Sequence, residues 1–342
     1  MPEAASRVQL EPAFSVRTVM REISYAEAMV EALHDIMRAD PRAQIIGPHF
    51  LGLSPRRTLL EGLRRDFPDR IFDPPIAELG FCGLAIGAAM AGVRPVVSIG
   101  TASFIFQAYA QIVNEAANAH YMSGGQFTVP VVFQILHGLR GRGASQHSHS
   151  PQAMLWNTPG LQIMLPASPA DMKGLLKTAA ASDNPTIWVD HARLFEMKGP
   201  VPDGDFRIPF GVAEVKRPGK DVTVVATSLM VPRSLAAAEA LAREKIDVEV
   251  VDPRTLVPLD EAAILASVRK TGRLVVADEC HRRCGVGAEI AALVAEQAFG
   301  ALKAPIRRVV TADVPVPFNP GQEAFIEPTQ DKIEAAVRAV VR

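Results

Sequence analysis

The stretch RIFDPPIAELGFCGLAIGAAMAGVRPVVSI, residues 70–99, contains the alternation that decides the fold. Residues 70–72 predict a short strand, and residues 94–99 predict a second strand rich in β-branched side chains. The segment 78–91 between them predicts a helix dense in glycine and alanine. Small side chains let another backbone approach closely, so we expect this helix to be buried or to lie at an interface. A strand, a helix and a strand in this order favour a parallel sheet with helices on its faces.

The same alternation continues along the chain in both directions and is interrupted only between residues 192 and 220, where prolines and glycines concentrate. We therefore expect an α/β fold with two doubly wound, mostly parallel sheet domains. The expected boundaries are a leader over 1–22, a first domain over 23–198, a linker over 199–218 and a second domain over 219–342. Within the first domain, Ser24 is expected to cap a helix, and 106–120 to form one continuous helix.

The overall composition excludes several classes of function. The chain has 342 residues, with 36 Lys and Arg against 37 Asp and Glu, so no global basic field exists to attract nucleic acid or an anionic membrane. Its apolar stretch around 81–93 is shorter than the roughly 20 residues that a membrane-spanning helix needs. The three cysteines are too few for a disulfide scaffold, which favours a reducing compartment. These features predict a cytoplasmic protein.

Glu78 is the first candidate for chemistry, because it begins the expected helix at the end of a predicted strand. Ligands of open α/β sheets bind outside the carboxyl ends of the strands. The next two turns of this helix are almost entirely apolar, so the Glu78 carboxylate would have little water around it. The alternative is an ordinary first-turn glutamate that is stabilised by the helix dipole.

The loop over 138–151 is the most polar part of an apolar half and contains His147 and His149. An imidazole there could move a proton or bind an anion near neutral pH. A solvated loop histidine is the alternative, and a metal site is disfavoured because no third ligand has a natural spacing. Cys280, His281 and Cys284 suggest zinc, but no second Cys pair completes four ligands. The glycines at 285 and 287 are better explained by a tight turn than by a nucleotide loop.

Taken together, several blocks of sequence resemble the beta subunits of thiamine-diphosphate-dependent 2-oxo acid dehydrogenases, of the pyruvate, branched-chain and acetoin types. The resemblance covers about residues 22–340 and implies a transketolase-like pyrimidine-binding domain followed by a transketolase-like C-terminal domain. The blocks are PIAELGF (75–81), QIVNEAA (111–117), YMSGG (121–125), QHS (146–148), PGL (159–161), KGLL (173–176), RTLVPLD (254–260), GVGAEI (285–290) and DVPVP (313–317).

The resemblance implies roles for individual residues. Glu78 corresponds to the glutamate that hydrogen-bonds the aminopyrimidine ring of thiamine diphosphate. Phe104 corresponds to the aromatic residue that stacks against that ring, and Gln107 and Ile76 belong to the same cofactor-binding region. His147 corresponds to the histidine that contacts the substrate or intermediate and assists acylation of a lipoyl group.

The resemblance also implies partners, because no Gly-Asp-Gly motif followed by Asn-Asn occurs in the sequence. In this family a separate alpha subunit holds Mg²⁺ and the diphosphate, and the active site lies between the subunits. We therefore expect an α2β2 heterotetramer with two beta subunits, inactive without alpha, that passes acyl groups to a lipoyl-bearing acyltransferase. A family potassium site would lie near Ala179 and Asn184.

Departures from the family pattern leave the acyl substrate open. Ser98 stands where glutamate is frequent, His149 replaces a common glutamine, and the segment 134–140 lacks the usual glycine-rich sequence. The substrate is therefore a 2-oxo acid or acetoin. The alternatives are the C-terminal half of a split transketolase, which shares both domains, and a non-catalytic interaction subunit. The blocks at 254–260 and 313–317 favour the dehydrogenase over transketolase, and Glu78, Phe104 and His147 together argue against a non-catalytic subunit.

Overall fold

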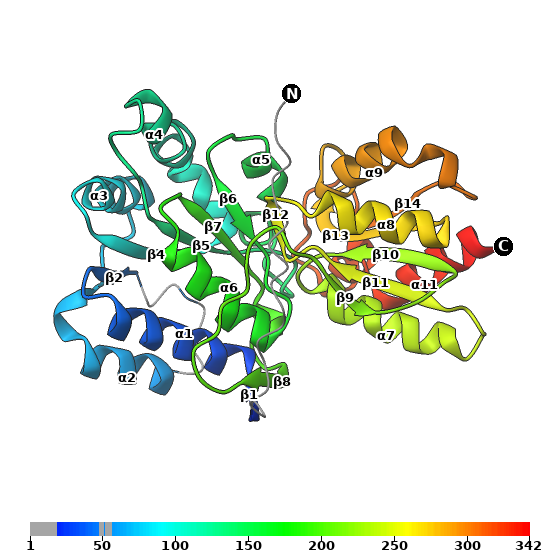
Figure 1. Ribbon diagram of the computed structural model, residues 1–342, viewed down its shortest axis with the longest axis horizontal. Helices are drawn as coiled ribbons and strands as arrows, with labels where there is room; N and C mark the ends of the chain where they lie inside the picture. Colours follow the sequence, from blue (N-terminus) through cyan, green and yellow to red (C-terminus); the bar gives the residue numbers. More distant parts are fainter. Residues whose placement is uncertain (1–18, 48–50, 52–56) are drawn as a thin grey trace, which may run out of the picture.

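A computed structural model describes residues 19–47, 51 and 57–342. Two sheets lie side by side, the first formed mainly by the N-terminal half and the second by the C-terminal half (Figure 1). Helices cover both faces of each sheet, so the expected α/β class with two doubly wound, mostly parallel sheets is confirmed. No helix within the described ranges combines the length and apolar character needed to cross a bilayer.

The first sheet has, among the described residues, seven strands in the order β12-β6-β7-β5-β4-β2-β3. All neighbours are parallel except the edge strand β12, which runs antiparallel to β6. The parallel strands are rich in Val and Ile and almost fully buried, as expected for a sheet covered on both faces. The strands are β2 (Ala43–Ile46), β3 (Ile71–Phe72), β4 (Arg94–Thr101), β5 (Val132–Leu136), β6 (Gln162–Met164), β7 (Thr186–Asp190) and β12 (Thr255–Val257).

The second sheet has five strands within the described part of the chain, in the order β14-β13-β10-β11-β9. Only β9 is antiparallel to its neighbour. Its strands are β9 (Glu214–Arg217), β10 (Val222–Ala226), β11 (Val248–Asp252), β13 (Leu274–His281) and β14 (Arg307–Thr311).

The helices form two layers that continue from one sheet to the other. On one side of the first sheet lie α1 (Tyr25–Ala39), α2 (Arg57–Asp66) and α6 (Pro169–Ala181), and on the other lie α3 (Glu78–Met90), α4 (Ala119–Met122) and α5 (Gln152–Trp156). The second sheet is covered by α7 (Met230–Ala242) and α11 (Gln330–Val341) on one face and by α8 (Glu261–Thr271) and α9 (Val286–Gln297) on the other (Figure 1). Each of the two large apolar clusters contains residues of both halves, so the two sheets share their cores.

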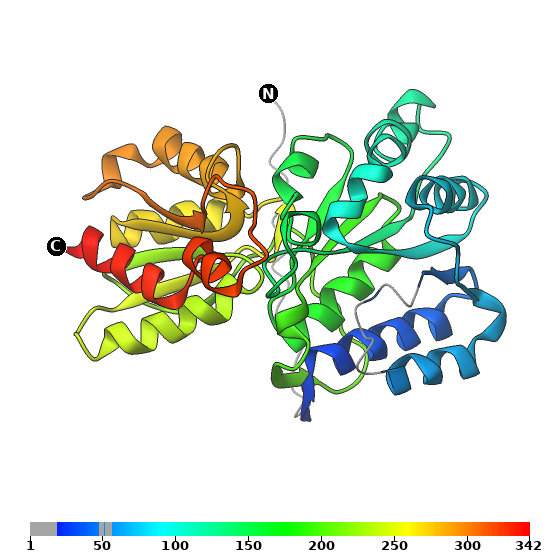
Figure 2. The same ribbon diagram turned by 180° about the vertical axis from the view of Figure 1, so that it is seen from behind.

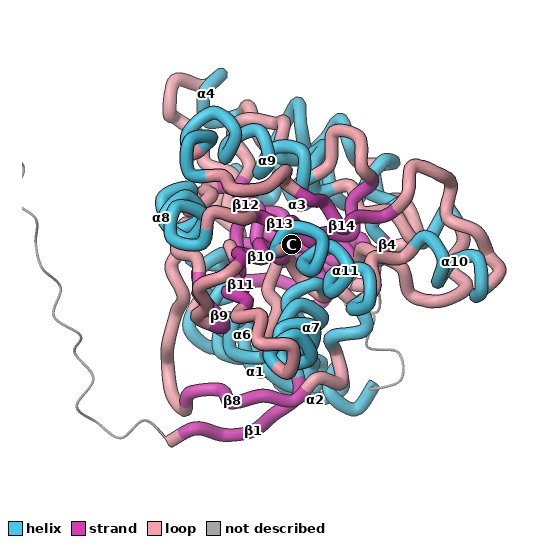
Figure 3. The backbone as a smooth tube through the Cα atoms, turned by 90° about the vertical axis from the view of Figure 1, so that its right-hand side faces the viewer, coloured by secondary structure: helices cyan, strands magenta, loops and turns pink. Residues whose placement is uncertain are grey.

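The first helix begins where the sequence predicts. The Ser24 hydroxyl accepts the backbone N–H of Glu27, and the Glu27 carboxylate accepts the backbone N–H of Ser24, which completes a capping box. Ser24 also ends β1 (Met20–Ser24), which pairs with β8 (Lys198–Pro202) in a separate two-stranded ribbon at the lower edge of Figure 3. Residues 20–22 and 199–202 are thus strand, although the sequence suggested a leader over the first range and a linker over the second. The two strands are far apart in the chain and pair through backbone groups, so no local sequence pattern predicts the pairing.

The single helix expected over 106–120 is wrong. The chain instead forms a 3₁₀ turn, η4 (Ala102–Gln107), a π-helical turn, η5 (Gln111–Ala116), and the short α4. Tertiary packing explains the break, because the Ala117 carbonyl lies so close to Gly160 that a Cβ there would come within 2.1 Å. Local helix propensity cannot report such a contact. Three further elements were not predicted, namely β9, which lies inside the expected linker, β12 and the seven-residue α10 (Pro320–Ile326).

Candidate active site

The residues singled out in the first half lie just beyond the carboxyl ends of neighbouring parallel strands. Glu78 follows β3, Phe104 follows β4, and the loop with His147 follows β5. Because β3, β2, β4 and β5 run parallel, their carboxyl ends share one edge of the sheet. This edge is where open α/β sheets bind ligands.

Glu78 is the first residue of α3, and only 8% of it is exposed. No side chain caps the helix, so the backbone N–H groups of its first turn keep a partial positive charge that stabilises the carboxylate. Among the described residues, the carboxylate has no hydrogen-bond or ion-pair partner. Burial, together with the negative charge of Glu78, raises the pKa of the neighbouring Cys82 thiol well above its ordinary value. The residue is buried, but its carboxylate oxygens keep some contact with solvent, so a ligand at this edge could reach them and supply a donor.

Phe104 and His147 are brought together by the fold. Their rings meet edge to face, with centroids 5.5 Å apart. The contact extends on both sides, because Ser103 Oγ lies 2.8 Å from His149 Nδ1 and the Phe106 ring meets the His149 ring at 5.3 Å. Burial, with a smaller effect from His281, lowers the pKa of His149 and favours its neutral form. The turn after β4 and the loop after β5 thus form one aromatic and imidazole cluster.

Arg140 is a member of this cluster that the sequence did not single out. Its Nη2 donates to Thr101 Oγ1 at 3.0 Å and to the backbone carbonyl of His147 at 2.7 Å. No described carboxylate pairs with the guanidinium. Burial lowers the pKa of Arg140, although an arginine remains charged near neutral pH. An arginine between Leu139 and Gly141 could have been noticed, but the direction of its side chain depends on how the loop folds.

Gln107 and Ile76 lie near these residues in the chain, but no described contact ties them to the cluster. Gln107 ends η4 and is exposed, and Ile76 is 78% exposed just before α3. Their assignment to cofactor binding stays a prediction.

The turn that contains the potassium candidates is bound by a guanidinium. Arg94 donates to the carbonyls of Ala180 and Ser182 and to Asp183 Oδ1, at 2.5–3.0 Å. The Ala179 carbonyl accepts the N–H of Ser182, and the Asn184 carbonyl accepts the Thr186 hydroxyl. The Ala179 and Asn184 carbonyls thus each accept a hydrogen bond from the chain, and a guanidinium binds the same turn. The potassium site stays a prediction.

The residues that suggested zinc are used in other ways. Cys280 is buried and lies against the Ser150 carbonyl, whereas Cys284 is exposed. His281 Nδ1 contacts the Ala312 carbonyl at 2.7 Å. Within the described ranges, no group of three His, Cys, Asp or Glu side chains is arranged to hold a metal ion.

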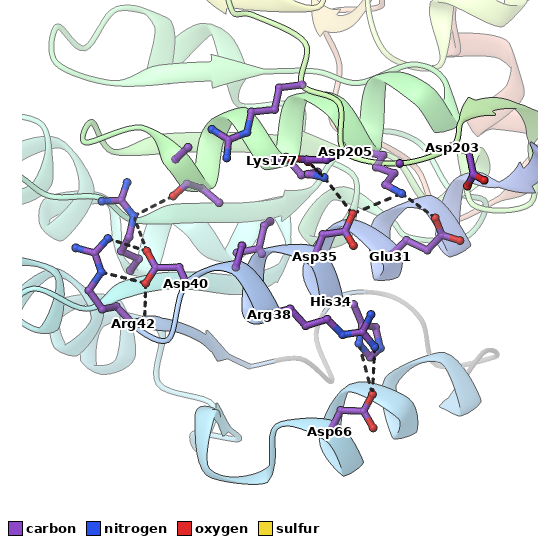
Figure 4. A pocket seen from close by; sticks show the side chains of 18 of the residues that line it. Glu31, His34, Asp35, Arg38, Asp40, Arg42, Asp66, Lys177, Asp203 and Asp205 are labelled. Carbon is purple, nitrogen blue, oxygen red and sulfur yellow. Dashed lines mark hydrogen bonds and ion pairs between the residues drawn. The ribbon is translucent and has the colours of Figure 1, made fainter. Parts of the chain in front are cut away.

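A large hollow of about 1130 Å³ lies elsewhere, on the α1, α2 and α6 side of the first sheet (Figure 4). Its walls are charged, but acids and bases pair with each other. Asp35 bridges Lys173 and Lys177 at 3.5 and 3.1 Å, and Asp66 lies 3.8 Å from both His34 and Arg38. We therefore place the candidate site at the strand ends, where a buried charge lacks a partner, and not in this larger hollow.

Comparison with known proteins identifies the family to which the chain belongs. Two family models match the chain, the transketolase pyrimidine binding domain over residues 21–196 and the transketolase C-terminal domain over 211–333. The beta subunit of acetoin:2,6-dichlorophenolindophenol oxidoreductase from Cupriavidus necator is 40% identical over 332 residues, which cover 94% of this chain and 98% of the relative. The pyruvate dehydrogenase E1 component subunit beta from Rickettsia felis is 41% identical, covering 93% and 98%. This chain belongs to the family of transketolase-like dehydrogenase beta subunits.

A solved structure titled as a split-gene transketolase, an inactive beta4 tetramer, has the same fold. It matches with a TM-score of 0.78 over 93% of this chain and 98% of its own, at 26% identity. The two dehydrogenase beta subunits above share considerably more sequence with this chain than that transketolase does. The resemblance stated from the sequence motifs is therefore confirmed, and the transketolase alternative is the weaker one.

Proposed function

We propose that the chain is the beta subunit of a thiamine-diphosphate-dependent dehydrogenase that is active only with an alpha subunit. The assembly would be an α2β2 heterotetramer that decarboxylates a 2-oxo acid and passes the acyl group to a lipoyl-bearing acyltransferase. The names of the relatives support an oxidoreductase complex, and the retained Glu78, Phe104 and His147 support a catalytic subunit.

The unpartnered carboxylate of Glu78 is the observation that carries the proposal. A ring nitrogen of an aminopyrimidine, when it carries a proton, is the type of donor that this carboxylate lacks. Thiamine diphosphate, when bound, supplies a carbon nucleophile and an electron sink that protein side chains cannot provide. Glu78 would hold a proton at the pyrimidine nitrogen, and its dry surroundings would strengthen that hydrogen bond.

Phe104 and His147 would form the wall next to the cofactor. The Phe104 ring offers an apolar face for stacking on the pyrimidine. His147 lies at the exposed edge of the Phe104 ring, where an imidazole can donate to, or accept from, a substrate oxygen. Mg²⁺ and the diphosphate would be held mainly by the alpha subunit.

Arg140 favours a 2-oxo acid over acetoin as the substrate. Its guanidinium lies in the loop with His147 and pairs with no described carboxylate. A 2-oxo acid is anionic and would supply the missing carboxylate, whereas acetoin is neutral and would leave the cation unpaired.

Helix α3 presents a surface that suits the alpha subunit. Leu79 and Leu84 are 58% and 66% exposed, and Gly87, one turn beyond Leu84, is also exposed. Apart from its own turn of helix, no described atom lies within 4 Å of where a Cβ of Gly87 would be. An exposed stripe with leucine and glycine beside a buried catalytic carboxylate is what an obligate partner would cover.

Co-expression with an alpha-type subunit tests the proposed function. The purified complex should bind thiamine diphosphate and Mg²⁺ and reduce an artificial electron acceptor with a 2-oxo acid. Activity with ketose phosphates alone would favour the transketolase alternative. A stable complex that binds no thiamine diphosphate would favour a non-catalytic subunit.

A further inference from the structure

The two ends of the loop that contains His147 are hydrogen-bonded to each other, but contacts from other parts of the protein hold its conformation. The Gly138 N–H donates to the His149 carbonyl at 3.2 Å, so residues 138–149 leave and rejoin the first sheet at one point. Between these ends, Arg142 and Ala144 have positive φ angles of 59° and 52°. Such conformations are strained for residues other than glycine, and they persist only where surrounding contacts impose them.

The principal contact comes from Glu323 of α10, in the C-terminal half. Its carboxylate, in a residue only 2% exposed, accepts the Gly141 N–H at Oε1 and the Arg142 N–H at Oε2, both at 2.7 Å. Gly141 also has a positive φ, of 80°, so two consecutive left-handed residues turn their amides toward one carboxylate. Successive amides in such a turn form an anion-binding concavity. Here the anion is a side chain of the same protein.

Other contacts hold the same loop against the C-terminal half. Glu279 of β13 accepts the Leu139 N–H at 3.3 Å and pairs with His191 at 3.0 Å. Ser145 Oγ donates to the Val316 carbonyl at 2.9 Å. Leu139 packs with Val316 and Ile326 in a small apolar cluster. Figure 2 shows the red-orange segment that includes α10 at the boundary between the two halves.

The anchored part of the loop connects directly to His147. Arg140 lies between Leu139 and Gly141, whose amides are bound by the two carboxylates, and its side chain donates to the His147 carbonyl and to Thr101. Thr101 ends β4, immediately before the turn with Phe104. A shift of the backbone at 141–142 would therefore move Arg140 and, with it, His147 relative to Phe104.

We propose that Glu323 is a positioning residue that fixes His147 against Phe104 by binding the backbone of the loop from the other domain. The inference rests on the proposed function, in which His147 contacts the substrate. It gives the C-terminal half a direct part in the geometry of the active site, although the proposed catalytic residues, Glu78 and His147, both belong to the first half. The two hydrogen bonds are charge-assisted and buried, the class with the largest individual effect.

The test compares Glu323→Gln, Glu323→Asp and a control, Glu327→Gln, in the assembled complex. Glutamine keeps the size of the side chain but places an amino group where one backbone N–H now donates. Aspartate keeps the charge and should restore part of the function. Glu327 is a buried carboxylate of the same segment that pairs with Arg193 and Arg233 and has no described contact with the loop.

Two measurements are needed. Hydrogen exchange of the amides of 141 and 142 should accelerate roughly 10- to 100-fold in Glu323→Gln, because charged hydrogen bonds are lost. The kcat should fall about 10- to 100-fold, with a smaller change in KM for the cofactor. Glu323→Asp should lie between wild type and Glu323→Gln, and Glu327→Gln should leave both loop exchange and kcat near wild type.

Three results would overturn the proposal. They are unchanged loop exchange in Glu323→Gln, faster exchange with wild-type kcat, and an equal loss of kcat in Glu327→Gln. If the wild-type complex proves inactive with every 2-oxo acid, the proposed function fails. The exchange comparison then still decides whether Glu323 holds the loop.

Discussion

The charged side chains on the two faces of the first sheet differ in whether they have partners. On the α1, α2 and α6 face, acids and bases are abundant and satisfy each other across a large hollow, as with Asp35 between Lys173 and Lys177. On the α3 face, charge is scarce, apolar side chains are exposed, and the buried carboxylate of Glu78 has no partner among the described residues.

Whether a charged side chain has a partner within the protein is therefore a better guide to a ligand site than the size or polarity of a cavity. Paired surface charges contribute little, with a median of about 0–1 kcal/mol, and require no ligand. The Glu78 carboxylate has low exposure and no partner among the described residues, so it is free to accept a donor from a ligand. The strand ends are therefore the place to test.

The largest effect is expected from Glu78→Gln. Loss of the carboxylate should lower kcat about 100- to 10,000-fold, because proton transfer at the pyrimidine would lose its partner. Assembly should be unchanged, since an amide fits the same space. The control is Asp35→Asn on the opposite face, which should leave turnover at the wild-type value. Steady-state assays of both complexes decide the matter, and equal turnover in the two variants would remove Glu78 from the mechanism.

The second effect concerns the exposed stripe of α3. Gly87→Trp should weaken assembly with the alpha subunit at least about 10-fold, because an indole would stand where the partner is expected to approach. The fold of the chain should persist, since apart from its own turn of helix no described atom lies within 4 Å of that Cβ position. Gly300 has equally open surroundings in the C-terminal half, so Gly300→Trp is the matched control. Analytical ultracentrifugation measures both, and intact assembly of Gly87→Trp would place the interface elsewhere.

A third test asks whether Arg140 is a functional charge. Arg140→Met should raise KM for a 2-oxo acid roughly 10- to 100-fold, because a charged hydrogen bond to the substrate carboxylate is lost. The inhibition constant of the neutral amide of that acid should change much less. If both values rise equally, Arg140 acts only through the shape of the loop.

The smallest effect is expected on the self-paired face. Lys177→Met removes contacts with Asp35 and Asp205 but leaves Lys173 beside Asp35. Lys177 is buried, but the apolar stem of methionine still packs there, and the carboxylates of Asp35 and Asp205 are exposed enough to be hydrated once the lysine is gone. Stability should therefore change by about 1 kcal/mol or less. Turnover should be unchanged. Thermal unfolding of the complex and its kcat measure the two effects, and a large loss of activity would mean that this hollow binds a ligand after all.

Local patterns predicted the parts of the fold that depend on neighbours in sequence. Ser24 and Glu27 lie three residues apart, so their capping box could be anticipated, and the alternation of apolar segments predicted the class of both sheets. The continuous helix over 106–120 failed because the packing of Ala117 on Gly160 depends on a distant segment.

The candidate site divides in the same way. Glu78 and His147 could be singled out because they lie in recognisable blocks, and Phe104 because the family resemblance extends over the segment between them. The structure joins Phe104 to His147. Glu279 and Glu323 could not, because each binds backbone amides more than 130 residues away. Every residue except proline has the same backbone N–H group. The sequence therefore does not show which of these groups a distant carboxylate will bind.

The position of strand β12 affects whether the two halves of the chain can be expressed as separate fragments. The strand belongs to the C-terminal half by sequence but forms the edge of the first sheet, beside β6. A cut in the proline-rich connection would leave β6 as a bare edge with unpaired N–H and C=O groups, which invites self-association of the fragment. The N-terminal fragment would need residues 255–257 supplied in trans, so the two halves are best expressed as a single chain.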